Sequence, residues 1–155
     1  MEKFMTTIQE ITLGGGCFWC IESAFNKVTG VVSAHCGYSN GHSDNPTYEQ
    51  VCSGTTGHNE VVRVVFDSDV ISLQEIFEIF FALHDPTQLN RQGNDKGTQY
   101  RGGIYYHNAQ QQAAAQAFVA QLTEDNVYDE PVVTEIEALD NYTQAEDYHQ
   151  DYFAN

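Results

Sequence analysis

One stretch of the sequence joins a thiol to a freely turning backbone: the run Gly14-Gly15-Gly16-Cys17-Phe18-Trp19-Cys20. Three glycines allow a sharp turn and a close approach to a ligand, and apolar residues at helical spacing follow from Phe18. Cys17 is therefore expected at a helix N-terminus, where free N–H groups and the helix dipole shift a thiol pKa from about 8.5 towards neutrality. A buried structural cysteine on a glycine-rich turn is the alternative that this run leaves open.

The elements that must position this run are indicated by hydrophobic periodicity. Residues 6–13 alternate as a strand entering the glycine turn, and the helix after Cys17 is expected to stop near Gly30. Ser72 and Glu75 form a capping box ahead of a helix that is apolar almost all round and is expected to be buried. Further strands are predicted over 31–36, 60–66, 104–107 and 131–139, with a helical turn over 47–51 and a helix over 109–122.

The order of these elements is β-α-β-β-α-β followed by α-β. This order predicts an α+β fold, a ferredoxin-like split βαβ sandwich with an added helix, strand and irregular C-terminal tail. A turn-rich surface loop is expected from Gly37 to about Asn45. The segment 84–101 is unusually long for a loop in a compact domain, which is typical of a functional loop.

Composition narrows the class of protein. A length of 155 residues predicts a single domain, 1–155. Six Lys and Arg against 22 Asp and Glu give a net charge of −16, which disfavours nucleic acid and anionic membrane surfaces as partners. With no apolar run of membrane-spanning length and no secretory signal, we expect a soluble cytoplasmic protein whose four cysteines stay reduced.

Short motifs occur in one order through nearly the whole chain. Gly16-Cys17-Phe18-Trp19 with Glu22 comes first, and the later pieces lie at 37–38, 45–48, 51–54, 57–58, 60–61, 85–87, 89–95, 97–101, 145–146 and 148–150. Each piece is weak alone, but their joint occurrence leaves little room for chance. On these motifs the sequence resembles the peptide methionine sulfoxide reductases of the A type, which reduce the S epimer of methionine sulfoxide.

The resemblance implies that Cys17 is the nucleophile, Glu60 the acid, and Tyr48 and Tyr100 the hydrogen-bond donors to the sulfoxide oxygen. These residue types suit the reaction, because a thiolate must attack the sulfur while a proton reaches the departing oxygen. Burial beside aromatic rings would have to raise the pKa of Glu60 for it to donate near pH 7. An exposed charge at a strand start is the alternative for Glu60.

The resemblance also implies a substrate pocket. Phe18 and Trp19 would receive the S-methyl group, where sulfur–aromatic contact contributes, and Asp95 would accept a backbone N–H of the substrate. On residue type alone, the two rings are equally ordinary core, and Asp95 is a turn residue. The implied substrates are free methionine sulfoxide and oxidised proteins or peptides, with thioredoxin as reductant and neither a metal nor an organic cofactor.

The thiol that resolves the sulfenic acid on Cys17 is where this sequence departs from the family. Many members carry recycling cysteines in a C-terminal tail, but here no cysteine follows Cys52. Cys20 stands where the family commonly has Gly, and at the start of a helix its Cα would lie about 5–6 Å from that of Cys17, within reach of a disulfide. We therefore expect Cys20 to resolve the sulfenic acid. Cys36 is the rival, because the flexible glycine-rich loop after it could bring it towards Cys17, and Cys52 is expected to be structural.

Two other classes of function are weighed against this one. A small zinc module would use the four cysteines, but only one CxxC is present and the six histidines are scattered. A general thioredoxin-like disulfide oxidoreductase would rest on Cys17-x-x-Cys20 alone. It disagrees with the glycine-rich entry and with the set formed by Tyr48, Glu60 and Tyr100.

Overall fold

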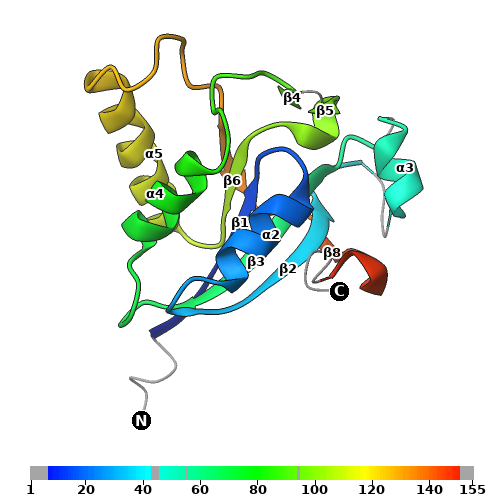
Figure 1. The fold of residues 1–155 in the computed structure, drawn as a ribbon, viewed down its shortest axis with the longest axis horizontal. Coiled ribbons are helices and arrows are strands. Elements are labelled where there is room, and N and C mark those ends of the chain that lie inside the picture. The colour runs from blue at the N-terminus through cyan, green and yellow to red at the C-terminus, as the bar shows by residue number, and fades with distance from the viewer. Residues whose placement is uncertain (1–6, 43–45, 55, 94, 151–155) are drawn as a thin grey trace.

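The computed structural model describes residues 7–42, 46–54, 56–93 and 95–150, and a six-stranded sheet organises them (Figure 1). The strand order is β7-β6-β1-β3-β2-β8. Each adjacent pair from β6 to β8 in this order is antiparallel, while β7 pairs with β6 in parallel. The strands are β1 (Ile8–Gly14), β2 (Val31–Ser39), β3 (Asn59–Asp67), β6 (Gly103–Tyr106), β7 (Glu135–Ala138) and β8 (Thr143–Gln144).

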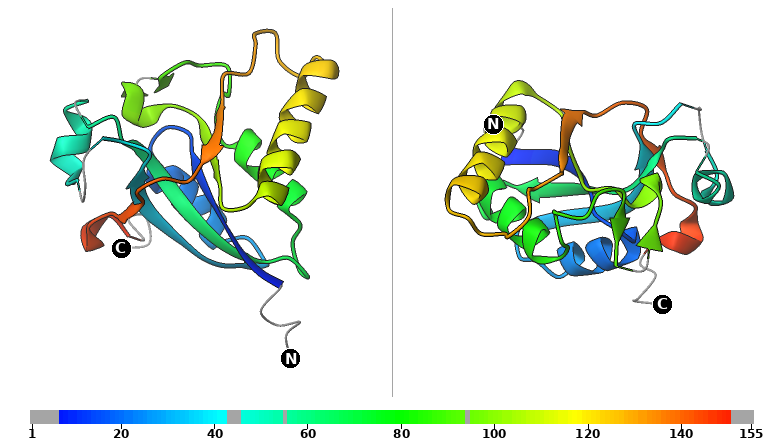
Figure 2. Two further views of the ribbon diagram at one scale, coloured as in Figure 1. Left: turned by 180° about the vertical axis from the view of Figure 1, so that it is seen from behind. Right: turned by 90° about the horizontal axis from the view of Figure 1, so that it is seen from above.

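The four central strands have the order of a split βαβ unit, so the predicted α+β fold is confirmed. Helices α2 (Phe18–Asn26) and α4 (Leu73–Ala82) lie on one face of the sheet, as the view from above in Figure 2 shows. The added helix α5 (Ala109–Glu124) packs beside α4, where Phe118 lies 5.7 Å from Phe77 and 5.4 Å from Phe81 between ring centroids.

Local sequence signals start the helices. The Ser72 side chain accepts a hydrogen bond from the N–H of Glu75, whose carboxylate in turn accepts one from Ser72, so the predicted capping box is present. The Asn108 side chain likewise caps α5 by accepting from Gln111 N–H. Such caps satisfy N–H groups that the first helical turn leaves open. The short helix α3 (Tyr48–Cys52) carries a capping box as well, built by Thr47 and Gln50.

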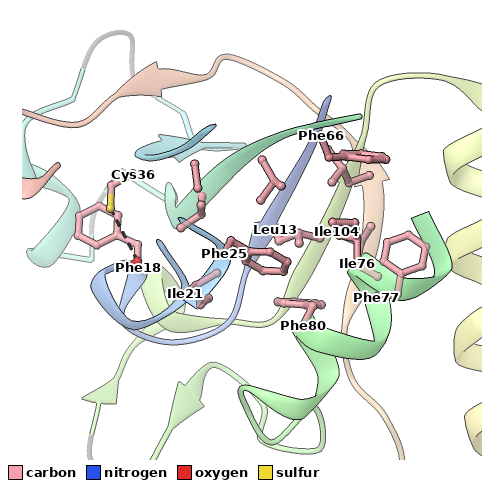
Figure 3. Packing of buried hydrophobic residues seen from close by; sticks show 14 of the residues in the cluster. Leu13, Phe18, Ile21, Phe25, Cys36, Phe66, Ile76, Phe77, Phe80 and Ile104 are labelled. Carbon is pink, nitrogen blue, oxygen red and sulfur yellow. Dashed lines mark hydrogen bonds between the residues drawn. The ribbon is translucent and has the colours of Figure 1, made fainter. Parts of the chain in front are cut away.

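The core lies between the sheet and the two helices and reaches the glycine turn. Its largest fully buried side chains come from every central element, as Figure 3 shows; they include Leu13, Phe18, Ile21, Phe25, Phe66, Ile76, Phe77, Phe80 and Ile104. Phe18 directly follows the candidate nucleophile. The position of Cys17 is therefore fixed by packing of its neighbour and not by the loop alone.

Several boundaries differ from the sequence predictions. Helix α2 ends at Asn26, about one turn before Gly30, and β2 continues through Gly37 and Tyr38 to Ser39. Those last residues pair with β3 and with β8, which a local turn signal cannot reveal. The rest of the expected loop is described only at 40–42, since 43–45 lie outside the described residues.

Helix α4 is amphipathic and not buried all round. Ile76, Phe77 and Phe80 are buried, whereas Gln74 and Glu78 are exposed to solvent. The segment 84–101 contains a two-stranded sheet, β4 (Arg91–Gln92) with β5 (Asp95–Lys96), and the 3-10 helix η1 (Thr98–Tyr100). The tail predicted to be irregular contains β8 and a second 3-10 helix, η2 (Asp147–His149).

Candidate active site

Cys17 lies where the sequence places it, at the N-cap of α2. Strand β1 ends at Gly14, and the chain turns through Gly16, whose φ of +87° is in the left-handed region that favours glycine. The N–H of Gly16 donates to the carbonyl of Tyr100 at 3.2 Å. The glycine turn therefore binds η1 to the end of β1, and Cys17 is held between them, half-buried.

The predicted fall in the pKa of Cys17 is wrong. Burial raises the pKa of the Cys17 thiol to about 12, and the negative charges of Glu60 and Asp95 raise it further. The backbone N–H of Trp19 favours the thiolate, as expected at a helix start, but desolvation is the larger effect. The local pattern reveals the helix start, and it does not reveal how completely water is removed around the sulfur.

Glu60 is buried at the beginning of β3, with 1% of its surface exposed. Its Oε1 accepts a hydrogen bond from the N–H of Phe18 at 3.4 Å, which brings the carboxyl group beside the nucleophile, while its Oε2 has no hydrogen-bond partner among the described residues. Burial raises the pKa of Glu60 to about 8, with Asp95 adding to the rise and the Phe18 N–H opposing it. The alternative of an exposed charge is excluded.

Tyr48 and Tyr100 approach this centre from two short helices. Tyr48 is the first residue of α3, and Tyr100 is the last of η1. Burial raises the pKa of both phenols, that of Tyr100 to about 12, and a charge on Glu60 contributes in each case. Both side chains are thus protonated hydroxyl donors near the carboxyl group of Glu60.

Phe18 and Trp19 form an aromatic wall with Tyr48. The ring of Phe18 stacks on that of Tyr48 at 6.3 Å, and Trp19 lies 6.4 Å from the same ring. Phe18 is completely buried and belongs to the core, so the alternative of ordinary core is confirmed for it, while its role in a substrate pocket stays a prediction. Trp19 is only partly buried and can present a face to a ligand.

His149 is a residue of this wall for which sequence reasoning gave no role. Its ring is buried, lies 4.4 Å from Tyr48 and 5.2 Å from Phe18, and its Nδ1 accepts the indole N–H of Trp19 at 3.0 Å. Burial lowers the pKa of His149, which favours the neutral imidazole that can accept. An indole N–H near a core needs a hydrogen-bond acceptor. The single tryptophan of the sequence was therefore a signal that an acceptor such as His149 lies beside it.

Glu146 holds the same segment against α3. Its carboxylate accepts from the Tyr38 hydroxyl at 2.8 Å and from the backbone N–H of Tyr48 at 3.0 Å. Gln150 completes the attachment by pairing with the backbone of Cys36, accepting from its N–H at 2.9 Å and donating to its carbonyl at 3.0 Å. We call residues 143–150 the strap, because they bind β2, α3 and the aromatic wall together.

Asp95 is exposed on β5, across from Gln92 in the small hairpin. Its charge acts on Cys17, Glu60 and Tyr100, so Asp95 lies close to these three groups. The structure therefore brings together all of the residues named for catalysis and substrate binding.

The other three cysteines differ sharply in environment. Cys20 is exposed on α2, and its N–H donates to the carbonyl of Cys17 at 3.3 Å. Cys36 is buried in β2, with its thiol directed at the carbonyl of Phe18 at 3.7 Å (Figure 3) and at Glu22. The flexible loop expected after Cys36 is strand. Cys52 is exposed and its thiol contacts the Tyr48 hydroxyl, and the structural role expected for it stays a prediction.

Two further findings concern the described residues as a whole. None of their His, Cys, Asp and Glu side chains gather in a group of three or more that could hold a metal ion. None of their helices has the length and apolar character required to cross a membrane.

The arrangement can perform thiol chemistry on a small polar group. It offers a sulfur atom, a carboxylic acid that keeps its proton at neutral pH, and two phenols, next to an aromatic wall. A sulfoxide that carries a methyl group suits these residue types, because an acid and phenols can donate hydrogen bonds to its oxygen and aromatic rings can contact its methyl group.

Comparison with known proteins agrees with this chemistry. A family model described as peptide methionine sulfoxide reductase matches residues 9–155. The "Peptide methionine sulfoxide reductase MsrA" of Natronomonas pharaonis is 54% identical over 142 residues, which cover 92% of this chain and 80% of the relative.

The fold is similar to solved structures of Mxr1 from Saccharomyces cerevisiae. Its reduced form is 36% identical, with a TM-score of 0.89 and coverage of 96% of this chain and 86% of that one. Mxr1 in complex with Trx2 is aligned at 23% identity with a TM-score of 0.67, covering 95% of this chain and 86% of that one.

Proposed function

This chain belongs to the peptide methionine sulfoxide reductases of the A type, oxidoreductases that act on methionine sulfoxide, and on that premise we propose that Cys17 is the nucleophile. The substrate is methionine (S)-sulfoxide, either free or within oxidised proteins and peptides. The observation that carries the proposal is the hydrogen bond from Phe18 N–H to Glu60, which sets a buried acid beside a thiol at a helix start.

The reductive step moves one oxygen atom from the substrate to Cys17. Glu60, with a pKa of about 8, is protonated at neutral pH and gives its proton to the sulfoxide oxygen, which Tyr48 and Tyr100 also bind by hydrogen bonds. The resulting positive charge on the substrate sulfur favours the thiolate of Cys17, which attacks it. The attack forms an S–S bond between Cys17 and the substrate. This bond and the substrate S–O bond then break as the OH group passes to the Cys17 sulfur, which leaves a sulfenic acid on Cys17 and releases methionine, while the proton of the original thiol restores Glu60.

The aromatic wall selects the substrate. Phe18 and Trp19 receive the S-methyl group, where sulfur–aromatic contact adds to burial. Asp95 accepts a backbone N–H of the substrate at the mouth of the site. No residue in this scheme requires a metal or an organic cofactor to carry out its step.

Cys20 then resolves the sulfenic acid. Its thiol attacks the sulfur of Cys17, water leaves, and a Cys17–Cys20 disulfide remains. Its exposure supports this role, since an external dithiol must also reach the disulfide. Thioredoxin is the proposed reductant, with the fold shared with Mxr1, solved with Trx2, as support. A thioredoxin-linked cycle and four free thiols are compatible with the reducing cytoplasm.

A single-turnover assay tests the nucleophile. Without external reductant, we expect Cys17→Ser to form no methionine from the S epimer, because a hydroxyl cannot be converted to a sulfenic acid. Cys20→Ser is the matched control in the same helix turn and is expected to form about one methionine per enzyme. Methionine formation by Cys17→Ser within about tenfold of wild type would refute the assignment.

A further inference from the structure

A closed ring of hydrogen bonds lies beneath the site, formed by residues that the reaction does not use. The amide of Asn59 donates to the Tyr105 hydroxyl at 2.9 Å, and this hydroxyl donates to Glu135 Oε2 at 2.8 Å. Arg101 Nε donates to Glu135 Oε1 at 3.1 Å, and the Asn59 amide closes the ring by donating to the Arg101 carbonyl at 2.9 Å. We call this set the polar ring; its members are Asn59, Arg101, Tyr105 and Glu135.

Three members of the polar ring are shielded from water. Asn59 and Tyr105 are completely buried, the Arg101 side chain keeps 12% of its surface exposed, and the Glu135 side chain is partly open to solvent with 33% exposed. In such surroundings each hydrogen bond strengthens the next, and removal of one member leaves its partners unsatisfied. The ring is therefore a rigid unit, not a set of independent surface contacts.

Two glycines leave the space that side chains of the polar ring occupy. Gly14, Gly103 and Glu135 lie in register across β1, β6 and β7. A Cβ on Gly14 would lie 2.5 Å from the Asn59 amide nitrogen, and one on Gly103 would lie 2.5 Å from the Tyr105 ring. Both contacts are closer than any side chain tolerates, so glycine at both positions opens a passage across three strands.

Two members of the polar ring are direct neighbours, along the chain, of residues of the site. Asn59 immediately precedes Glu60, and Arg101 immediately follows Tyr100. The Arg101 guanidinium also donates to the carbonyl of Thr98 at 2.8 Å, within the helix that carries Tyr100. The carbonyl of Tyr100 accepts from Gly16, directly before Cys17.

From this geometry we infer that Tyr105 and Glu135 are positioning residues of the reaction: through the polar ring they fix Glu60 and Tyr100 relative to Cys17. The inference rests on the proposed function. Glu135 lies on β7, outside the four central strands, so an edge strand that contacts none of the reacting atoms sets the alignment of acid and phenol. Misplacement by about 1 Å can cost on the order of 10²-fold in rate.

Tyr105→Phe tests this, because it removes one hydroxyl and keeps the ring that fills the passage. We expect the single-turnover rate of methionine formation to fall about tenfold or more with the apparent affinity for substrate unchanged. Tyr106→Phe is the matched control on the next residue of the same strand and is expected to match wild type. An unchanged rate for Tyr105→Phe would overturn the inference.

Glu135→Gln is the second variant, and it tests the positioning role independently if Tyr105→Phe does not fold. The amide cannot accept from both Arg101 and Tyr105 as the carboxylate does, so we expect a similar fall in rate; Glu137→Gln, exposed on the same strand, is its control. A rate equal to that of Glu137→Gln overturns the role of Glu135.

A double-mutant cycle separates positioning from general loosening of the fold. In a background that combines Glu60→Gln with Tyr100→Phe, the effect of Tyr105→Phe on the rate is expected to shrink to within about twofold, because both groups that it positions are gone. An equal effect in both backgrounds means a structural role and refutes the inference. If Glu60→Gln itself leaves the rate unchanged, the proposed function fails instead.

Discussion

The two walls of the site are held in different ways. Cys17 and Glu60 form one wall, which we call the sheet wall. They belong to β3 and to the junction of β1 with α2, where packing and burial fix them. Tyr48 and His149 form the other wall, which we call the strap wall. They lie on helices of five and three residues, and side-chain hydrogen bonds of the strap, such as the one from Tyr48 N–H to Glu146, hold these helices together. The difference teaches that the sheet wall sets protonation through desolvation, whereas the strap wall sets the shape of the pocket. Changes on the first should alter the chemical step, and changes at His149 on the second, where Tyr48 alone is assigned to the reaction, should alter substrate binding.

The largest effect expected on the sheet wall is loss of turnover in Cys20→Ser. This variant should release one methionine and then stop with thioredoxin, because no second thiol closes the disulfide. Steady-state turnover and peptide mapping of the oxidised protein measure this. Cys52→Ser removes the exposed thiol of the other wall and should keep turning over. A Cys17–Cys36 bridge, with normal turnover by Cys20→Ser, would transfer the resolving role to Cys36.

Glu60→Gln should lower the single-turnover rate by on the order of 10²-fold or more, with substrate affinity nearly unchanged, because the amide cannot donate an acidic proton. In wild type the same step should slow above about pH 8, as Glu60 loses its proton. Stopped-flow rates across this range check both statements. If Glu60→Gln changed affinity alone, the separation between the two walls would be wrong.

Burial of Glu60 should also appear in stability. Its folded pKa of about 8 lies above an unfolded value of about 4.3, so between these values the folded state binds the extra proton. The stability that this proton contributes is complete below about pH 4.3 and is lost as the pH rises through 8. Urea unfolding should therefore show that the free energy of unfolding of Glu60→Gln rises relative to that of wild type from about pH 5 to about pH 9. A constant difference between the two proteins would contradict the burial argument.

The smallest effect is expected on the strap wall. His149→Phe keeps a ring against Tyr48 and removes the acceptor of the Trp19 N–H. Loss of one hydrogen bond of about 1 kcal/mol should raise KM about fivefold with kcat within about twofold. Steady-state kinetics on free methionine sulfoxide measures this split. A fall in kcat without a change in KM would mean that this wall also takes part in the chemistry.

The sheet wall was predictable because its signals are local. The apolar run that begins after Glu60 predicts a buried strand, and Ser72 with Glu75 predicts a helix start; both are present. The strap was not predictable, since Glu146 and His149 find their partners about a hundred residues earlier in the chain. No local pattern encodes such contacts.

The pKa of Cys17 shows the same limit within the predictable wall. The helix start was read correctly, and its dipole was expected to govern the thiol. Desolvation governs it instead, and desolvation depends on how the core, η1 and β5 close around the sulfur. A motif indicates which groups are present, but the medium around them follows from the whole fold.

The position of Trp19 has an optical consequence. It is the only tryptophan of the chain, and its indole N–H is bonded to the strap at the substrate wall. Fluorescence excited selectively in the indole band therefore comes from one side chain, two residues along the chain from Cys17. We expect entry of a sulfoxide and closure of a Cys17–Cys20 disulfide each to alter the surroundings of that fluorophore. Its emission would then follow the catalytic cycle in real time, without a label.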